Sequence, residues 1–250
     1  MSVRNLSAAD GPPRDRSVDG TPTDRGLGTQ PSKQEVRLRS SGANSAGPPV
    51  TWHPPAPRSG LAGYWDRFVG PGMTAIESWI LLVGGLTVAA LSLAVFWTGK
   101  DQDFAAWQVV ILGLIAFDIA GGVIDNATSA AKRWYHRPGV GTRQHLGFIA
   151  LHIVYLAYVS VVFVERPWWY FGVFTALLML CAVIVEAVPL FVQRPVAMAL
   201  YAASIAISML GFAAAPGLEW FVPLLFLKLL IGHLLREAPF RPGDERLTLS

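Results

Sequence analysis

The sequence predicts an all-α membrane protein, a bundle of about six transmembrane helices with a disordered N-terminal tail. Two observations predict this fold. The 250-residue chain is 52% hydrophobic and only 15% charged, whereas soluble proteins usually carry about 25% charged residues. The polar residues are also unevenly placed, because residues 1–60 hold half of the 18 prolines and long apolar runs dominate the chain beyond them. A tail joined to a membrane domain explains this split better than one globular core does.

The two ends of the chain are expected to be cytoplasmic tails. Residues 1–60 are rich in Pro, Gly, Ser and Arg and contain few large apolar side chains, so burial cannot offset the entropy lost on ordering. Residues 241–250 form a second, short tail. We expect no cleavable signal peptide, because the first residues lack an apolar core followed by a small-residue cleavage site. The first apolar run is then a retained span.

Six apolar segments between residues 61 and 240 are candidates for membrane spans, since an α-helix needs about 20 residues to cross the hydrocarbon core. The last is the shortest and least apolar, because it contains Lys228 and His233. The predicted spans are Ile76–Trp97, Phe104–Ile124, Leu146–Val164, Trp168–Val192, Pro195–Ala215 and Leu218–Leu235. Pro195 is expected in the first turn of the fifth span, where proline is tolerated.

Basic residues in the loops predict the orientation. With six spans and a cytoplasmic N-terminus, only Lys100 and Arg166 lie near the outer side of the membrane. Nine basic residues lie near the inner side: Arg67, Lys132, Arg133, Arg137, Arg143, Arg194, Arg236, Arg241 and Arg246. This bias predicts an integral protein of the plasma (inner) membrane with cytoplasmic N- and C-termini. It also accounts for the net charge of +3, so we expect the lipid bilayer and no nucleic acid as a partner.

Ionisable groups inside spans are costly and usually face the protein interior or a water-filled cavity. Counting 1.5 Å per helical residue places Asp118 and His152 at one depth, with Lys228 near the same level. We therefore expect Lys228 to be the charge partner of Asp118. The other polar candidates fall in the cytoplasmic half. The predicted cavity consists of Asp118, Asp125, Asn126, His145, His152, Glu186, Lys228 and His233.

Two further sets of residues have expected roles at or near this cavity. Gly121 and Gly122 would let another helix approach closely. The basic loop between the second and third spans could contact anionic lipid headgroups through Lys132, Arg133, Arg137 and Arg143. Whether the chain acts alone or as an oligomer, the sequence does not indicate.

The biochemical activity stays open between several hypotheses. The first is a polar cavity facing the cytoplasm, in a transporter of a small solute, ion or proton or in a scaffold component. The alternative is an intramembrane hydrolase of a lipid-like substrate, with a metal held by His145, His152 and Asp118. Haem bound by His145 or His152 is a weaker hypothesis, because the chain has few paired histidines. No nucleotide-binding or catalytic motif of soluble enzymes occurs.

Overall fold

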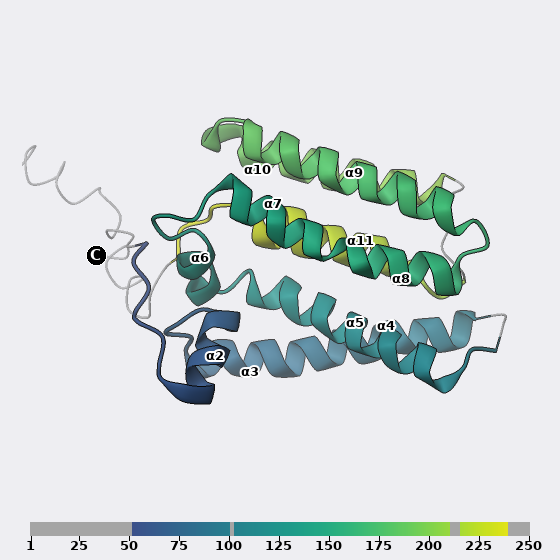
Figure 1. The fold of residues 1–250 in the computed structure, drawn as a ribbon, viewed down its shortest axis with the longest axis horizontal. Helices are drawn as coiled ribbons and strands as arrows, with labels where there is room; N and C mark the ends of the chain where they lie inside the picture. Colours follow the sequence, from purple (N-terminus) through teal and green to yellow (C-terminus); the bar gives the residue numbers. More distant parts are fainter. Residues whose placement is uncertain (1–51, 101–102, 211–215, 240–250) are drawn as a thin grey trace, which may run out of the picture. The chain divides into compact units, whose positions relative to one another are not determined.

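The computed structural model describes residues 52–100, 103–210 and 216–239, and these form helices and no strands (Figure 1). Within these ranges, five helices are long and apolar enough to cross a membrane: Ala75–Gly99, Ala106–Asp125, Thr142–Phe163, Pro167–Ala187 and Leu190–Met209. Most side chains on these helices face outward, since no more than 33% of each apolar window is buried. The chain is therefore a multi-pass membrane protein.

Six spans are not confirmed. The sixth apolar segment forms α11 (Phe221–Phe226), which continues as the π-helical turn η2 (Leu227–His233). Together they are shorter than the helices that qualify as spans. At 1.5 Å per residue they reach about 20 Å, against about 30 Å for a hydrocarbon core.

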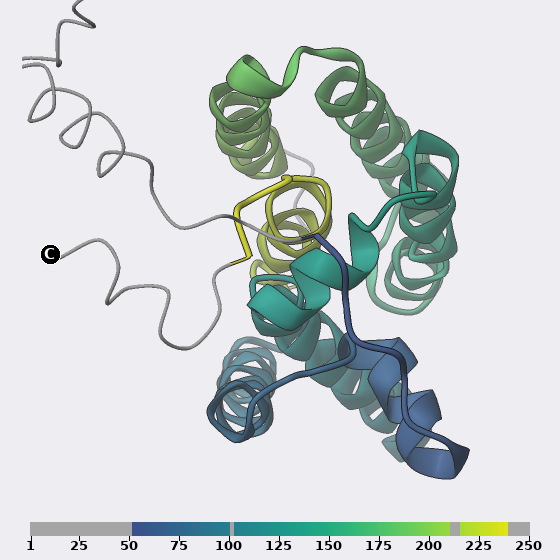
Figure 2. The same ribbon diagram turned by 90° about the vertical axis from the view of Figure 1, so that its left-hand side faces the viewer.

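This short segment is nevertheless the most enclosed part of the bundle. None of the residues from Phe221 to His233 is exposed, and Figure 2 shows α11 and η2 (yellow) surrounded by the other helices. The core includes Phe221, Leu225 and Phe226, each 0% exposed. An apolar helix that touches protein on every side needs no lipid contact. The sixth segment is thus the centre of the bundle.

The first and third spans are built from several pieces. The first consists of α3 (Ala75–Trp79), the π-helical turn η1 (Ile80–Gly84) and α4 (Gly85–Gly99). The third consists of α7 (Thr142–Leu151) and α8 (Ile153–Phe163), which meet at a break centred on His152. Such interruptions of α-helices often lie at functional sites.

The fourth and fifth spans are α9 (Pro167–Ala187) and α10 (Leu190–Met209). Pro189 separates them at the N-cap of α10, because proline disfavours helical geometry in the residue before it. The expectation for Pro195 is wrong, since it lies inside α10 instead of in its first turn. The hydrogen bond that Pro195 cannot make leaves the Phe191 carbonyl without its usual partner.

The first and the last described residues of the chain lie at the same end of the bundle. The Arg236 guanidinium lies 4.4 Å from the centre of the Trp52 ring. Two short helices lie at this same end, α2 (Gly60–Val69) and α6 (Ser129–Tyr135), joined to the ends of the spans. The predicted tails fall largely at residues 1–51 and 240–250, which lie outside the described residues.

Candidate functional site

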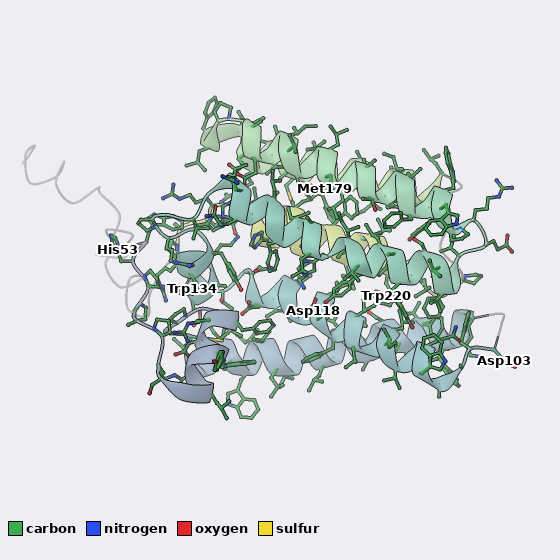
Figure 3. The ribbon with its side chains drawn as sticks, in the orientation of Figure 1. His53, Asp103, Asp118, Trp134, Met179 and Trp220 are labelled. Carbon is green, nitrogen blue, oxygen red and sulfur yellow. The ribbon has the colours of Figure 1, made fainter. Side chains whose placement is uncertain are left out.

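An ion pair joins α5 (Ala106–Asp125) to the central segment. The Lys228 Nζ on η2 contacts the Asp118 carboxylate and donates a second hydrogen bond to the Asp118 backbone carbonyl at 3.2 Å. Lys228 is only 2% exposed. This is the partnership that the depth argument predicts. Figure 3 shows Asp118 about midway along the bundle, between the layers of helices.

Glycines on α5 make room for this pair. A Cβ on Gly122 would lie 2.3 Å from the Lys228 Cε, so the lysine stem passes directly over Gly122. Gly121 has a different neighbour, because a Cβ added to Gly85 would lie 3.2 Å from the Gly121 Cα. Gly121 thus lets the first span approach α5, whereas Gly122 lets a charged side chain cross it.

His152 completes the polar group around Asp118. Its Nε2 lies 3.8 Å from Asp118 Oδ2, and its Nδ1 lies 2.8 Å from the Phe148 carbonyl. Only an N–H can bond a carbonyl, so Nδ1 carries the hydrogen. In the neutral ring Nε2 is then an acceptor that faces a carboxylate, which is also an acceptor. A hydrogen-bond donor placed between the two would satisfy both.

Asp125 and Asn126 end α5 on the side of α2 and α6. Both are buried, at 8% and 4% exposed. Among the described residues, Asp125 Oδ1 has no hydrogen-bond partner. A buried carboxylate oxygen without a donor is costly. Asp125 Oδ1 is therefore an unsatisfied acceptor in a residue that lines an interior space.

These groups line a cavity of about 830 Å³. Its polar lining residues are Ser78, Asp118, Asp125, Asn126, Tyr135, His152, Tyr155 and Lys228. The remaining lining is mostly apolar and includes Leu82, Phe117, Leu151 and Val154, whose side chains are exposed on the outer surface of the spans. The cavity thus has a polar side and an apolar side, and the apolar side includes exposed side chains of the spans.

The other predicted site residues form a separate cluster at the end of the bundle. His145 Nδ1 lies 2.9 Å from Glu186 Oε1, and its Nε2 lies 3.1 Å from the Tyr135 carbonyl. The His233 ring stacks on Phe148 at 4.1 Å. Neither ring nitrogen of His233 has a hydrogen-bond partner in the described part of the chain. The eight predicted residues therefore divide into a cavity group and an end cluster.

The predicted metal ligands are not gathered in one place. Asp118 and His152 are neighbours, but His145 turns to Glu186 and Tyr135 instead. Within the described ranges, no three His, Cys, Asp or Glu side chains are placed to hold a metal ion. Sequence spacing could not reveal this, because the three residues come from separate helical pieces.

Several of the basic loop residues bind the protein's own backbone. Lys132 Nζ donates to the carbonyls of Gly232 and Leu235 at 2.7 and 2.6 Å. Burial lowers the pKa of Lys132 to about 8, although nearby Glu237 opposes the shift. Arg133 reaches the Pro239 carbonyl at 3.4 Å. These two residues fasten the end of the central segment to α6.

The other two basic residues of the loop are Arg137 and Arg143. Arg137 stacks on the Trp134 ring, with 3.6 Å between its Cζ and the ring centre. Arg143 is exposed at the start of α7. Headgroup contact by the loop stays a prediction, and Arg143 is its best-placed residue.

Sequence reasoning missed four aromatic residues of the cavity lining and the helix α2. Tyr135 and Tyr155 line the cavity, as do Trp65 and Phe68 of α2. A signal for α2 was present, because Leu61, Tyr64, Trp65 and Phe68 follow the i, i+3, i+4, i+7 spacing of an amphipathic helix. We found no match for this chain among protein-family models, curated proteins or solved structures.

Proposed function

We propose that this membrane protein binds an amphipathic, lipid-like molecule whose head carries hydrogen-bond donors or a positive charge. The observation that carries the proposal is the two-sided cavity of about 830 Å³. This volume lies in the range of small-molecule sites, about 300–1,000 Å³. A hydrocarbon chain fits the apolar side, where Leu82, Phe117 and Leu151 face the bilayer. The head then lies against the acidic side.

The polar side favours a donor over an acceptor. Asp125 Oδ1 has no donor among the described residues, and the Asp118 carboxylate faces the acceptor nitrogen of His152. Lys228 pairs with Asp118, and the Asp125 Oδ1 has no hydrogen-bond partner in the described part of the chain. A ligand amine or hydroxyl would supply the donor that Asp125 lacks.

The bundle end that holds α2 and α6 is the cytoplasmic one in this proposal. Its support is the bias of basic residues towards that end and the meeting of Trp52 with Arg236 there. If the central segment counts as a crossing, the chain crosses an even number of times. The cavity then belongs to the inner leaflet of the bilayer.

Transport and hydrolysis have weaker support. A transport path would have to continue past the aromatic rings at the opposite end, where Phe96, Phe104 and Phe163 pack with centroids 4.8 to 5.6 Å apart. A metal-dependent hydrolase would need a third ligand beside Asp118 and His152. Ligand binding, on its own or in a scaffold, requires neither.

The test compares three probes that differ only in the head: dodecylamine, dodecanol and dodecanoate. The full chain in phosphatidylcholine nanodiscs is heated, and unfolding is followed by maleimide labelling of its buried single cysteine, Cys181. A ligand at a hundredfold excess over Kd stabilises by about 2.7 kcal/mol. We expect dodecylamine to raise the Tm most and dodecanoate least.

Two variants separate this cavity from general membrane effects. Asp125→Asn should abolish the preference for the amine, because it removes the unpartnered carboxylate without changing its size. Asp103→Asn is the matched control, since Asp103 is an exposed acid beside Lys100 outside the cavity. Equal shifts from all three probes, or an amine preference that survives in Asp125→Asn, would contradict the proposal.

A further inference from the structure

The α2 helix presents an exposed apolar face. Leu61, Tyr64, Trp65 and Phe68 share this face, and Leu61 is 87% exposed. The opposite face is buried and carries Gly63, Asp66 and Val69. Figure 2 shows α2 (dark blue) at the end of the bundle, running outward from it.

The buried face of α2 is fixed to α6 by specific contacts. Trp134 Nε1 donates to the Arg67 carbonyl at 3.0 Å, and the Tyr135 hydroxyl donates to the Phe68 carbonyl at 2.7 Å. These bonds satisfy carbonyls in the last turn of α2, which lack partners within the helix. The exposed face therefore has a set direction.

Gly70 holds α2 close to α6. It has φ of 94°, and a Cβ there would lie 2.6 Å from the Ala130 carbonyl carbon. The chain then turns within a few residues into the first span, which begins at Ala75. The outward side chains of that span, including Ile76, Trp79 and Ile80, are also exposed. The apolar face of α2 thus continues the bilayer-facing surface of the first span.

We propose that α2 lies in the plane of the membrane, with its apolar face in the boundary between headgroups and acyl chains. Helices of this kind bury their apolar face about 5–10 Å into that boundary. Tyr and Trp, both present on the face of α2, are the residues that favour this depth. The occupant of the face is the phospholipid leaflet itself.

Charge on α2 does not drive this contact. Asp66 is held by Arg58, with 2.6 Å between Asp66 Oδ1 and Arg58 Nη2. Arg67 turns back to the Gly63 carbonyl at 3.0 Å. Insertion is therefore expected to be independent of whether the headgroups are anionic.

Contact of α2 with the leaflet would bring the lipid next to the cavity. Trp65 and Phe68 belong both to the exposed face and to the cavity lining. The leaflet that covers α2 is thus continuous with the apolar side of the cavity. A molecule dissolved in this leaflet would reach the cavity beneath α2 without crossing water.

The test measures the depth of single cysteines in the full chain carrying Cys181→Ala. Leu61→Cys and Tyr64→Cys report on α2, each labelled with bimane in phosphatidylcholine nanodiscs. Leu91→Cys on the exposed face of α4 and Pro138→Cys in the α6–α7 loop are the depth controls, both exposed positions. Quenchers are doxyl groups high on the acyl chain and aqueous iodide.

We expect the upper-chain doxyl lipid to quench both α2 labels roughly threefold more than the Pro138→Cys label, because α2 lies at the depth of that doxyl group. Iodide should quench the Pro138→Cys label most. Adding phosphatidylglycerol should leave the α2 values unchanged. Iodide quenching of α2 equal to that of Pro138→Cys would overturn the proposal. So would protection from both quenchers, which would mean that a second copy of the chain covers α2.

Discussion

The space between the helices is filled at one end of the bundle and left open towards the other. At the end opposite α2, Phe96, Phe104 and Phe163 close the space between helices with aromatic rings. Towards α2, polar groups and glycines leave about 830 Å³ unfilled. One sequence thus fills one half and keeps the other open. Specific residues therefore maintain the cavity, because the same helices pack without one at the other end.

The largest expected loss of stability comes from removing the charge partner of Asp118. Lys228→Met should destabilise the protein by about 3–5 kcal/mol, because it strands a carboxylate inside the membrane domain. The double variant Asp118→Asn with Lys228→Met should recover most of this loss. The measurement is thermal unfolding in nanodiscs, followed at Cys181.

The closed half supplies the control for this pair. Phe96→Ala removes a fully buried ring and should also cost about 3–5 kcal/mol. Its cost has a different origin, a void among apolar groups, so Asp118→Asn should not relieve it. If Asp118→Asn failed to rescue Lys228→Met, the loss would not come from an Asp118 carboxylate left without its charge partner.

A smaller loss of stability is expected from adding a side chain at Gly122, over which the Lys228 stem passes. Gly122→Ala places a methyl group 2.3 Å from the Lys228 Cε and should cost about 1–3 kcal/mol through overpacking. Gly121→Ala is the matched control, because its nearest contact beyond its own helix is Leu81 Cδ1 at 3.7 Å. Equal stability of the two variants would contradict the described path of the lysine.

The last effect is graded, and it concerns pH at the end of the bundle. Burial, with the nearby charges of His145 and Lys132, lowers the pKa of His136 to about 3. An unfolded histidine has a pKa near 6.5, so only the unfolded chain gains this proton as pH falls from about 6.5 towards 3. Stability should therefore decline in this window, by about 1.4 kcal/mol per pH unit from this group.

His136→Gln isolates that contribution. Its amide can still donate to the His233 carbonyl, as the His136 Nε2 does at 3.0 Å, but it does not titrate. The variant should lose less stability than the wild type between pH 6.5 and about 4, measured by thermal unfolding. Parallel pH profiles for the two proteins would show that His136 is not held neutral.

Hydropathy predicted the fold class because the cost of exposing backbone in lipid forces apolar segments into helices. It marked the sixth segment as the shortest and least apolar but could not show that protein encloses it, since lipid and protein interior are equally apolar neighbours for Phe221 or Leu225. Only the structure distinguishes the enclosed central helix from the exposed spans. The interior position of Pro195 was not predicted, because α10 begins earlier than expected, directly after Pro189.

For the site, depth counting along helices predicted the contact of Asp118 with Lys228, because 1.5 Å per residue fixes height well. It could not fix rotation about each helix axis. His145 therefore faces Glu186, and the end cluster separates from the cavity. The break at His152 was also beyond sequence patterns, since its residues are all compatible with a continuous helix.

The enclosed central segment has a consequence for how the protein is made. It follows the five long helices in the chain, so a ribosome releases it after they have emerged. Until then the helices that surround it have no common centre to pack on, and a chain cut before Leu218 would expose the polar side of α5. Folding of the central segment would be complete when Lys132 donates hydrogen bonds to the carbonyls of Gly232 and Leu235. Assembly of the described bundle thus waits for a segment that is synthesised after the five long helices.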